Sequence, residues 1–459
     1  MTVQKPSLAK GVRDFGPAVM KKRKFIMNTI EQCFVQYGFE AIETPAVEKL
    51  STLTDKYGEE GDQLLFKILN NGDFLNAATQ EIYDSKDSKK LSKVITEKGL
   101  RYDLTVPLAR YVSMNRSHIT FPFKRYQIQP VWRADRPQRG RYREFWQCDA
   151  DIVGSTSTYV DIELLDLYND VFLNLKLPVI IRFNNRKIFD CILQDNLKDE
   201  DSFRFMQLID KYDKIGDKVN DLLLTDINQK AVDIWTKLLE ANAKKTNTEK
   251  LQALSLIFPT IPEELLEELK GDLDLVQSKG KNAISLDFTL ARGLSYYTGI
   301  IYEVVPQAEL LPEGFSVGSI GGGGRYDKLT EMFGFDGGQG VGISFGLDRI
   351  YDVMESADLF QNDIEDDRNI LFCVMDKENM PMGYRLCKSL REEGLRAELY
   401  PKALKLRKQL DYANAKKIRF AAIIGQNEIL NKTVMMKDLE SGEQKQMDWS
   451  EIKTFIQAV

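Results

Sequence analysis

The chain has 459 residues, 43% hydrophobic and 29% charged, with a net charge of −6 from 63 basic and 69 acidic residues. This ordinary globular composition is long enough for about three domains. The single histidine, His118, excludes sites that need two, such as a His-Glu-x-x-His zinc site, and we expect it to be a surface or turn residue. The five scattered cysteines form no Cys-x-x-Cys pair, so we expect neither disulfides nor a bound metal.

No stretch of the sequence approaches the ~18 consecutive apolar residues of a membrane span, and the N-terminus has no apolar signal segment. We therefore expect a soluble cytoplasmic protein that does not contact membranes. Because the net charge is negative, any binding of nucleic acid has to come from a local basic patch.

The first predicted elements are a helix and two hairpins. Apolar residues recur at helical spacing over 17–37. Apolar runs flank Asn70-Asn71-Gly72, and Asn-Gly favours a hairpin because both turn residues need positive φ. Two aromatic, β-rich runs, 125–132 and 144–153, are joined by an arginine-rich loop and predict a second hairpin.

The later sequence predicts three further parts. Residues 186–280 are poor in glycine and have helical periodicity, which indicates a helical insertion in a mixed α/β domain formed by 1–185 and 281–355. An acidic stretch follows, and we interpret 356–368 as a linker. In 369–459, strands and helices alternate, which predicts a small α/β domain with a largely parallel sheet.

The loop 133–143 carries five arginines and one aspartate. Guanidinium groups bind phosphate oxygens in pairs and stay charged, so the loop indicates a phosphate site rather than a solvated basic turn. Arg292 lies between apolar stretches and needs an anionic partner, and Arg349 follows a strand closely enough to reach a phosphate. The glycines at 321–324 form no P-loop, because no Gly-Lys-[Ser/Thr] follows, but they allow close approach to a ligand or a second sheet.

Polar pairs suggest a second ligand group. Asp103 and Thr105 are two residues apart, so on an extended chain they face the same side, where a carboxylate and a hydroxyl suit an ammonium group. A cap at a strand end is the alternative for this pair. Gln147 and Asp151 also share a face and are costly to bury without partners.

These pieces together describe a site for an anionic nucleotide and an amino-acid-like ligand, rich in arginine and without a general base. One reaction needs no base: attack of an ionised carboxylate on the α-phosphate of ATP. Its barrier is charge build-up, which cations and in-line positioning relieve.

At this point the sequence resembles the histidyl-tRNA synthetases, a family of class II aminoacyl-tRNA synthetases, over the whole chain. Segments 20–48, 125–154 and 340–350 resemble the three class II motifs. The sequence Lys10-Gly-Val-Arg-Asp-Phe-Gly-Pro17 and the blocks 292–299 and 322–329 are similar to signatures specific to the histidine enzymes.

The resemblance implies a role for each candidate residue. The residues implied to bind ATP, aided by Mg²⁺, are Arg133 at the α-phosphate, Asp135 at the adenine amino group, Phe145 stacked on adenine, and Arg141 and Arg349 at the outer phosphates. The residues implied to bind histidine are Asp103, Thr105 and Gln147 at its ammonium group and Asp151, Tyr296, Tyr297 and Tyr326 at its imidazole. Arg292 would be the catalytic cation, acting with Arg133 and Arg349.

The resemblance also implies an α/β (α+β) catalytic domain with an antiparallel sheet flanked by helices, a homodimer, and a C-terminal domain that binds the anticodon of tRNA. Between 401 and 419 there are seven basic residues and one acid, a local charge of +6. The residues implied to bind tRNA are Lys402, Lys405, Arg407, Lys408, Lys416 and Lys417. A solvated helix face is the alternative for this stripe.

The sequence departs from the family pattern at Ser295, where aspartate is usual, and at Trp146, where tyrosine or histidine is common. Both adjoin ligand positions without replacing one, so they bear on fine tuning. An alternative function is that of a non-catalytic regulatory subunit of ATP phosphoribosyltransferase. Such subunits usually lack the C-terminal domain and have decayed motifs, whereas this sequence keeps both.

Overall fold

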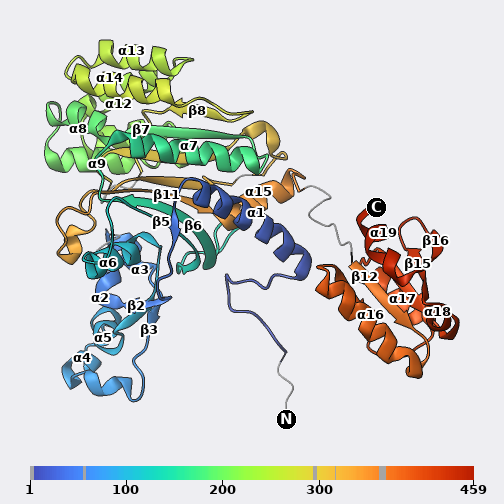
Figure 1. Cartoon of the computed structure of the whole chain (residues 1–459). Coiled ribbons are helices and arrows are strands. Elements are labelled where there is room, and N and C mark those ends of the chain that lie inside the picture. Colours follow the sequence, from blue (N-terminus) through green and yellow to red (C-terminus); the bar gives the residue numbers. More distant parts are fainter. Residues whose placement is uncertain (1–4, 55–57, 293–296, 316, 361–368, 459) are drawn as a thin grey trace. The chain divides into compact units, whose positions relative to one another are not determined.

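The computed structural model describes residues 5–54, 58–292, 297–315, 317–360 and 369–458 (Figure 1). The chain divides into two compact units, Met1–Phe360 and Gln361–Val459, each described by itself below.

An eight-stranded sheet organises the first unit. Five of its seven neighbouring strand pairs are antiparallel, and only the two pairs at the edges, β1–β5 and β7–β8, are parallel, which confirms the predicted antiparallel sheet. In spatial order the strands are β1 (Glu40–Ala41), β5 (Phe123–Trp132), β6 (Glu144–Val153), β11 (Gly340–Gly346), β10 (Gly321–Arg325), β9 (Ile300–Pro306), β7 (Val179–Asn185) and β8 (Ala283–Leu286).

Alternation along β6 gives this sheet two chemically different faces. Cys148, Ala150 and Ile152 are fully buried in the apolar core, whereas the odd-numbered residues between them are polar and point the other way. The core face packs against α1 (Pro17–Gln36), α7 (Thr158–Asn174) and α15 (Leu347–Ser356), as Figure 1 shows. The opposite face of the sheet is therefore available for a polar site.

Aromatic rings fill the layer between these helices and the sheet. The Phe345 ring of β11 lies 4.8 Å from the Tyr168 ring, 5.6 Å from Phe172 and 5.8 Å from Phe34, measured between centroids. Each such pair stabilises the core by about 0.5–1.5 kcal/mol beyond its area burial. The helix predicted over 17–37 is confirmed as α1, and its buried Ile26 and Ile30 join this core.

One predicted hairpin is confirmed and the other is wrong. β5 and β6 pair in antiparallel register from Phe123–Val153 to Trp132–Glu144. At Asn70-Asn71-Gly72, Gly72 has the expected positive φ of 76°, but Phe74–Ala77 forms the 3₁₀ helix η1. The reason is local: the Asp73 carboxylate accepts a hydrogen bond from the Leu75 N–H and caps that helix.

A smaller three-stranded sheet and short helices surround that turn. In this sheet β4 lies between β2 and β3 and is antiparallel to both. Its strands and the neighbouring helices are β2 (Val47–Lys49), β3 (Lys67–Ile68), β4 (Lys98–Leu100), α2 (Leu50–Leu53), α3 (Gly58–Gln63), α4 (Gln80–Asp84), α5 (Ser88–Ile95) and α6 (Thr105–Asn115).

Between β7 and β8 the chain is helical, as predicted for this part of the sequence. Its buried apolar residues, with Trp235 the largest, belong to the same core cluster as the sheet, and the Tyr212 ring packs edge-on against Trp235 at 5.0 Å. The helices are α8 (Arg186–Gln194), α9 (Asp199–Ile209), α10 (Tyr212–Ile215), α11 (Lys218–Asp226), α12 (Gln229–Asn242), α13 (Asn247–Ile257) and α14 (Glu263–Leu275).

The second unit is an α/β domain with a five-stranded sheet in the order β13-β12-β14-β15-β16. β12 is parallel to β13 and to β14, but β14–β15 and β15–β16 are antiparallel, so the expected largely parallel sheet is only half right. A parallel return needs a crossover of a dozen or more residues, and only the eight residues 425–432, which include α18, separate β14 from β15. The elements are β12 (Asn369–Val374), α16 (Met380–Glu392), β13 (Arg396–Leu399), α17 (Leu406–Ala415), β14 (Phe420–Ile424), α18 (Gln426–Asn431), β15 (Thr433–Asp438), β16 (Gln444–Asp448) and α19 (Ile452–Ala458).

The structure also bears on the expectations for His118 and for membrane spans. His118 is exposed in the turn after α6, as expected of a surface residue. Its backbone N–H donates a hydrogen bond to the Asn115 carbonyl at 2.8 Å. In the described part of the chain, no helix combines the length and the apolar character needed to cross a bilayer.

Candidate active site

A cleft of about 980 Å³ opens on the polar face of the large sheet. It brings together most of the residues that the sequence singled out. Those that line it are Asp103, Thr105, Arg133, Asp135, Arg141, Phe145, Gln147, Arg292, Tyr297 and Arg349. Asp151 and Tyr326 do not line it, and Tyr296 and Ser295 fall outside the described residues.

The arginine loop between β5 and β6 supplies two cations to the cleft. The Arg133 side chain is held by its Nε donating to the Tyr102 carbonyl at 3.1 Å, with its guanidinium 4.2 Å from the Tyr102 ring centroid and 5.1 Å from that of Phe145. Arg141 is more exposed, and Asp135, a carboxylate on the same loop, is 3.8 Å away. Both guanidinium groups can therefore turn N–H donors toward an anion in the cleft.

Arg349 enters from the first turn of α15 and joins the loop to that helix. Its Nε donates to the Gly140 carbonyl at 2.8 Å and its Nη1 to the Ser319 carbonyl at 2.7 Å. Burial and the positive charges of Arg292, Arg133 and Arg141 lower the pKa of Arg349. Four cations therefore crowd one end of the cleft, and a bound anion would relieve their repulsion.

Arg292 reaches the same end of the cleft from the chain preceding β9. Its Nη2 donates to the Ser319 hydroxyl at 2.8 Å and forms an ion pair with Glu303 of β9. A Cβ atom at Gly322 would lie 2.9 Å from the Arg292 Nη1, so glycine at this position leaves room for the guanidinium. The glycines of β10 do permit a close approach, but by a side chain and by β11 of the same sheet rather than by the second sheet that was one of the two expected partners.

The other end of the cleft is anionic, but Asp103 and Thr105 do not lie on an extended chain as predicted. Thr105 begins helix α6, and the Asp103 Oδ1 accepts a hydrogen bond from the Val106 N–H at 3.1 Å. The capping alternative is therefore correct for Asp103. Both residues nevertheless line the cleft, because the start of this helix points into it.

Gln147 and Asp149 on β6 form the floor of this end. The Gln147 Nε2 donates to the Ser344 hydroxyl at 2.9 Å, and Ser344 also hydrogen-bonds to Asp149. Two acceptors, Gln147 Oε1 and Asp149 Oδ1, are buried without a hydrogen-bond partner among the described residues. These two unpartnered acceptors lie near the carboxylate of Asp103, at the start of α6, and together they suit a ligand that carries N–H donors.

Asp149 was not predicted from the sequence, although its position two residues after Gln147 on a strand would have placed it on the same face. Its side chain is 3% exposed, and burial raises its pKa to about 7, against the lowering effect of Arg125. A cationic ligand would stabilise the ionised form of this carboxyl group.

Asp151, in contrast, has its partners within the protein. It is 2% exposed, lies 2.6 Å from the Arg125 Nη2, and accepts a hydrogen bond from the Tyr326 hydroxyl. Burial raises its pKa, and Arg125 acts in the opposite direction. The predicted contact of Asp151 and Tyr326 with an imidazole stays a prediction, since both lie behind the cleft wall.

The signature sequence at 10–17 is joined to this site through Asp348 at the start of α15. The Asp348 Oδ1 pairs with Arg13 and, at 2.6 Å, with the buried Arg23 of α1, while Oδ2 accepts from the Trp146 N–H at 2.9 Å. One buried carboxylate thus fixes the N-terminal segment, α1, β6 and α15 to one another.

The helical segment after β7 also contributes a wall of the cleft, which the sequence did not indicate. The lining residues from this segment are Ile209, Asp210, Tyr212, Asp213 and Lys214. They flank Arg182 of β7, which also faces the cleft. Nothing in their local pattern marks them, because their approach to Arg182 depends on how the helices pack.

The predicted basic stripe lies in the second unit. Lys405 immediately precedes α17, Arg407 and Lys408 lie in its first turn, and Lys416 and Lys417 follow its end. The side chains of all five residues and that of Lys402 are exposed. Arg419 differs, because it pairs with Asp438 of β15 at 3.3 Å.

Comparisons with known proteins agree with this arrangement. Residues 73–350 match the family described as histidyl-tRNA synthetase, and residues 369–459 match the anticodon binding domain. The chain is 48% identical over 446 residues to histidine–tRNA ligase of Bacteroides fragilis (96% of each chain) and 47% identical to that of Porphyromonas gingivalis (100% of each). Among solved structures it is similar to histidyl-tRNA synthetase from Nostoc (TM-score 0.80, 28% identity, 99% of this chain and 100% of that one). The chain therefore belongs to the histidyl-tRNA synthetase family of class II aminoacyl-tRNA synthetases.

Proposed function

We propose that this chain joins L-histidine to its tRNA in two steps, by forming histidyl-adenylate from ATP and then transferring histidine to the 3′ end of the tRNA. The observation that carries the proposal is the charge separation within one cleft. Four arginines crowd one end, and the acceptor oxygens of Gln147 and Asp149, unpartnered among the described residues, lie at the other. Phosphates belong at the first end and an ammonium group at the second.

In the first step a carboxylate oxygen of histidine attacks the α-phosphorus, and pyrophosphate leaves with the electron pair of the broken P–O bond. Arg133 and Arg292 neutralise the α-phosphate oxygens, and Arg141 and Arg349 hold the departing pyrophosphate. Asp135 binds the adenine amino group and Phe145 stacks on the ring. No proton has to be removed from the nucleophile, so cations and positioning are sufficient.

Histidine is selected by hydrogen bonds at the anionic end. Asp103, Thr105 and Gln147 bind the ammonium group together with Asp149, and Tyr297 stands beside the imidazole. Asp151, Tyr326 and Tyr296 complete the imidazole pocket in this proposal. An apolar competitor would leave buried polar groups unpaired, and such sites discriminate strongly.

We assign Mg²⁺ to ATP, on whose outer phosphates it would add positive charge. The cleft carboxylates nearest the arginines fit this assignment because they are paired with arginines and do not have to hold the metal themselves. Glu303 pairs with Arg292 and Arg182, and Asp135 lies near Arg141. Their role is to hold the arginines that bind the phosphates.

The organisation that we propose is a catalytic domain of residues 1–185 and 281–355, a helical insertion at 186–280, an acidic linker at 356–368 and an anticodon-binding domain at 369–459. Helices α8–α14 between β7 and β8 support the insertion. We further propose a cytoplasmic homodimer. Sedimentation of the purified chain would test the number of subunits.

The main alternative is a non-catalytic regulatory subunit of ATP phosphoribosyltransferase. Two observations favour the ligase: the anticodon-binding domain is matched over 369–459, and all four arginines line the cleft. The discriminating measurement is histidine-dependent exchange of pyrophosphate into ATP with the purified chain. We expect exchange that requires histidine, and a flat result would overturn the catalytic proposal.

A further inference from the structure

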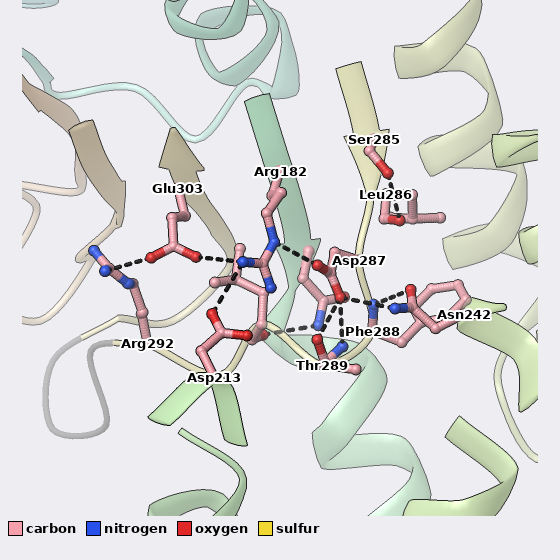
Figure 2. A network of polar contacts seen from close by, with 12 residues as sticks. Arg182, Asp213, Asn242, Ser285, Leu286, Asp287, Phe288, Thr289, Arg292 and Glu303 are labelled. Carbon is pink, nitrogen blue, oxygen red and sulfur yellow. Dashed lines mark hydrogen bonds and ion pairs between the residues drawn. The ribbon is translucent and has the colours of Figure 1, made fainter. Parts of the chain in front are cut away.

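A chain of ion pairs, centred on the buried Glu303, leads from the cleft into the helical segment (Figure 2). Figure 2 shows Glu303 between two guanidinium groups, Arg292 on one side and Arg182 on the other, with Asp213 and Asp287 beyond Arg182. Asp213 belongs to α10, so the pairs join that short helix to the arginine placed at the α-phosphate.

Glu303 is fixed by the sheet. It lies on β9 directly opposite Arg182 of β7, and it is 4% exposed. Its Oε1 pairs with the Arg292 Nη2, and its Oε2 lies 3.1 Å from the Arg182 Nη1. A buried carboxylate is costly unless it is paired, so one arginine has to remain with Glu303 whenever the other leaves.

Arg182 is suited to be the arginine that remains. Its Nε lies 2.5 Å from Asp287, and Asp287 is held in turn by Thr289 and by the Asn242 side chain at 3.0 Å. Burial alone would lower the pKa of Arg182, but its carboxylate partners outweigh burial and raise it. Arg292 has fewer anchors among the described residues and is 38% exposed, so it is the mobile partner of the two.

Asp213 and Glu303 both approach one nitrogen of Arg182, but Asp213 accepts a hydrogen bond from it, whereas the Glu303 Oε2 accepts none among the described residues. The Arg182 Nη1 lies 3.0 Å from the Asp213 Oδ2 and 3.1 Å from the Glu303 Oε2. The more Arg182 is drawn toward Asp213, the more Glu303 depends on Arg292. A change at α10 therefore alters how firmly Glu303 retains Arg292.

We propose that Glu303 is a positioning residue for Arg292, and that Arg182 transmits the position of α10 to it. This inference rests on the proposed function, in which Arg292 acts at the α-phosphate. When ATP binds, Arg292 leaves Glu303 and pairs with phosphate oxygens instead. Arg182 stays with Glu303 and balances its negative charge. The helical segment thereby adjusts the affinity of the cleft for ATP without touching the nucleotide.

The first experiment tests whether Glu303 acts through Arg292. Glu303→Gln should lower kcat of histidine-dependent exchange by about tenfold or more while the KM for histidine stays unchanged, since Arg292 is misplaced at the phosphates and the contacts to histidine are untouched. In an Arg292→Lys background, which keeps a cation and therefore measurable exchange, the same change should have little further effect. An equal loss in both backgrounds, or a raised KM for histidine, would show a structural role and overturn the proposal.

The second experiment tests the link to α10. Asp213→Asn should lower the KM for ATP by about twofold or more. Without Asp213, Arg182 pairs more closely with Glu303, and Glu303 then holds Arg292 less firmly. In a Glu303→Gln background this response should disappear. The matched control is Asp226→Asn, which removes an aspartate that pairs with Arg204 at the surface of the same helical segment.

The outcomes separate the two proposals. If the wild-type chain shows no histidine-dependent exchange, the proposed function fails. If the wild type exchanges normally but Asp213→Asn behaves like Asp226→Asn, or its effect persists without Glu303, the ion-pair link is wrong and the function stands.

Discussion

Asp149 and Asp151 lie two residues apart on one face of β6, and their surroundings give them different chemistry. Asp151 pairs with Arg125 and accepts from Tyr326, so its charge is compensated inside the protein. Asp149 lines the cleft and keeps one oxygen without a hydrogen-bond partner among the described residues. The amino-acid ligand, in our proposal, supplies the N–H donor that this oxygen lacks.

This difference predicts a pH effect on stability. The pKa of Asp149 is about 7 in the folded chain and about 3.9 when unfolded, so between these values the folded state binds more protons. The contribution of Asp149 to stability should fall as pH rises from about 4 to about 7 and level off above, and Asp149→Asn should remove it. Thermal unfolding on the acidic and the alkaline side of this window measures it. A melting-temperature difference between variant and wild type that does not change with pH would contradict the assignment.

Arg292 gives a second prediction at this scale. Arg292→Ala should abolish pyrophosphate exchange with the melting temperature nearly unchanged, because its side chain is partly exposed and Glu303 retains Arg182. Arg204→Ala, at an exposed ion pair with Asp226, is the matched control and should exchange normally. A large loss of stability in Arg292→Ala would instead indicate that this arginine supports the fold.

Among the elements, β10 depends most on its glycines. A Cβ atom at Gly323 would lie 2.1 Å from the Gly342 carbonyl oxygen of β11, a backbone atom that cannot move without parting the strands. Gly323→Ala should therefore destabilise the first unit by about 1–3 kcal/mol or more.

Gly271→Ala provides the control for that prediction, because Gly271 lies in α14, where a Cβ atom would meet nothing within 4 Å among the described residues. Alanine there should stabilise the chain by about 0.5–1 kcal/mol through helix propensity. Urea unfolding compares the two variants, and equal stabilities would refute the close-approach argument.

The elements also show what sequence patterns can predict. The β5–β6 hairpin was predictable because its alternation and its arginine loop are local features, and the cleft arginines followed from their charge and from the family motifs. The hairpin predicted at the Asn-Gly turn was wrong because Asp73 caps a 3₁₀ helix instead of starting a strand. The Arg182–Asp213 contact could not be predicted, since it spans 31 residues and depends on how α10 packs.

For the whole molecule, RNA binding should be separable from adenylate formation. Changing Lys405, Lys408 and Lys416 together to glutamine should raise the KM for tRNA and weaken its salt dependence, while exchange stays intact, because phosphate contacts release counterions. Lys377, Lys388 and Lys445 are exposed elsewhere on the second unit and provide a control of equal charge change. Aminoacylation at several salt concentrations measures the difference, and identical kinetics for both triple variants would exclude the stripe.

The order of strands in the large sheet has a consequence for synthesis on the ribosome. β11 lies between β6 and β10, although residue 340 is translated long after residue 153. At elongation rates of about 5–20 residues per second, β6 waits about 10–40 s for this neighbour. During that interval its open edge is a template for incorrect pairing with other nascent chains. The buried Asp348 is translated with the same segment. It then pairs with Arg13, which lies 335 residues earlier in the chain, and so completes the unit in one late step.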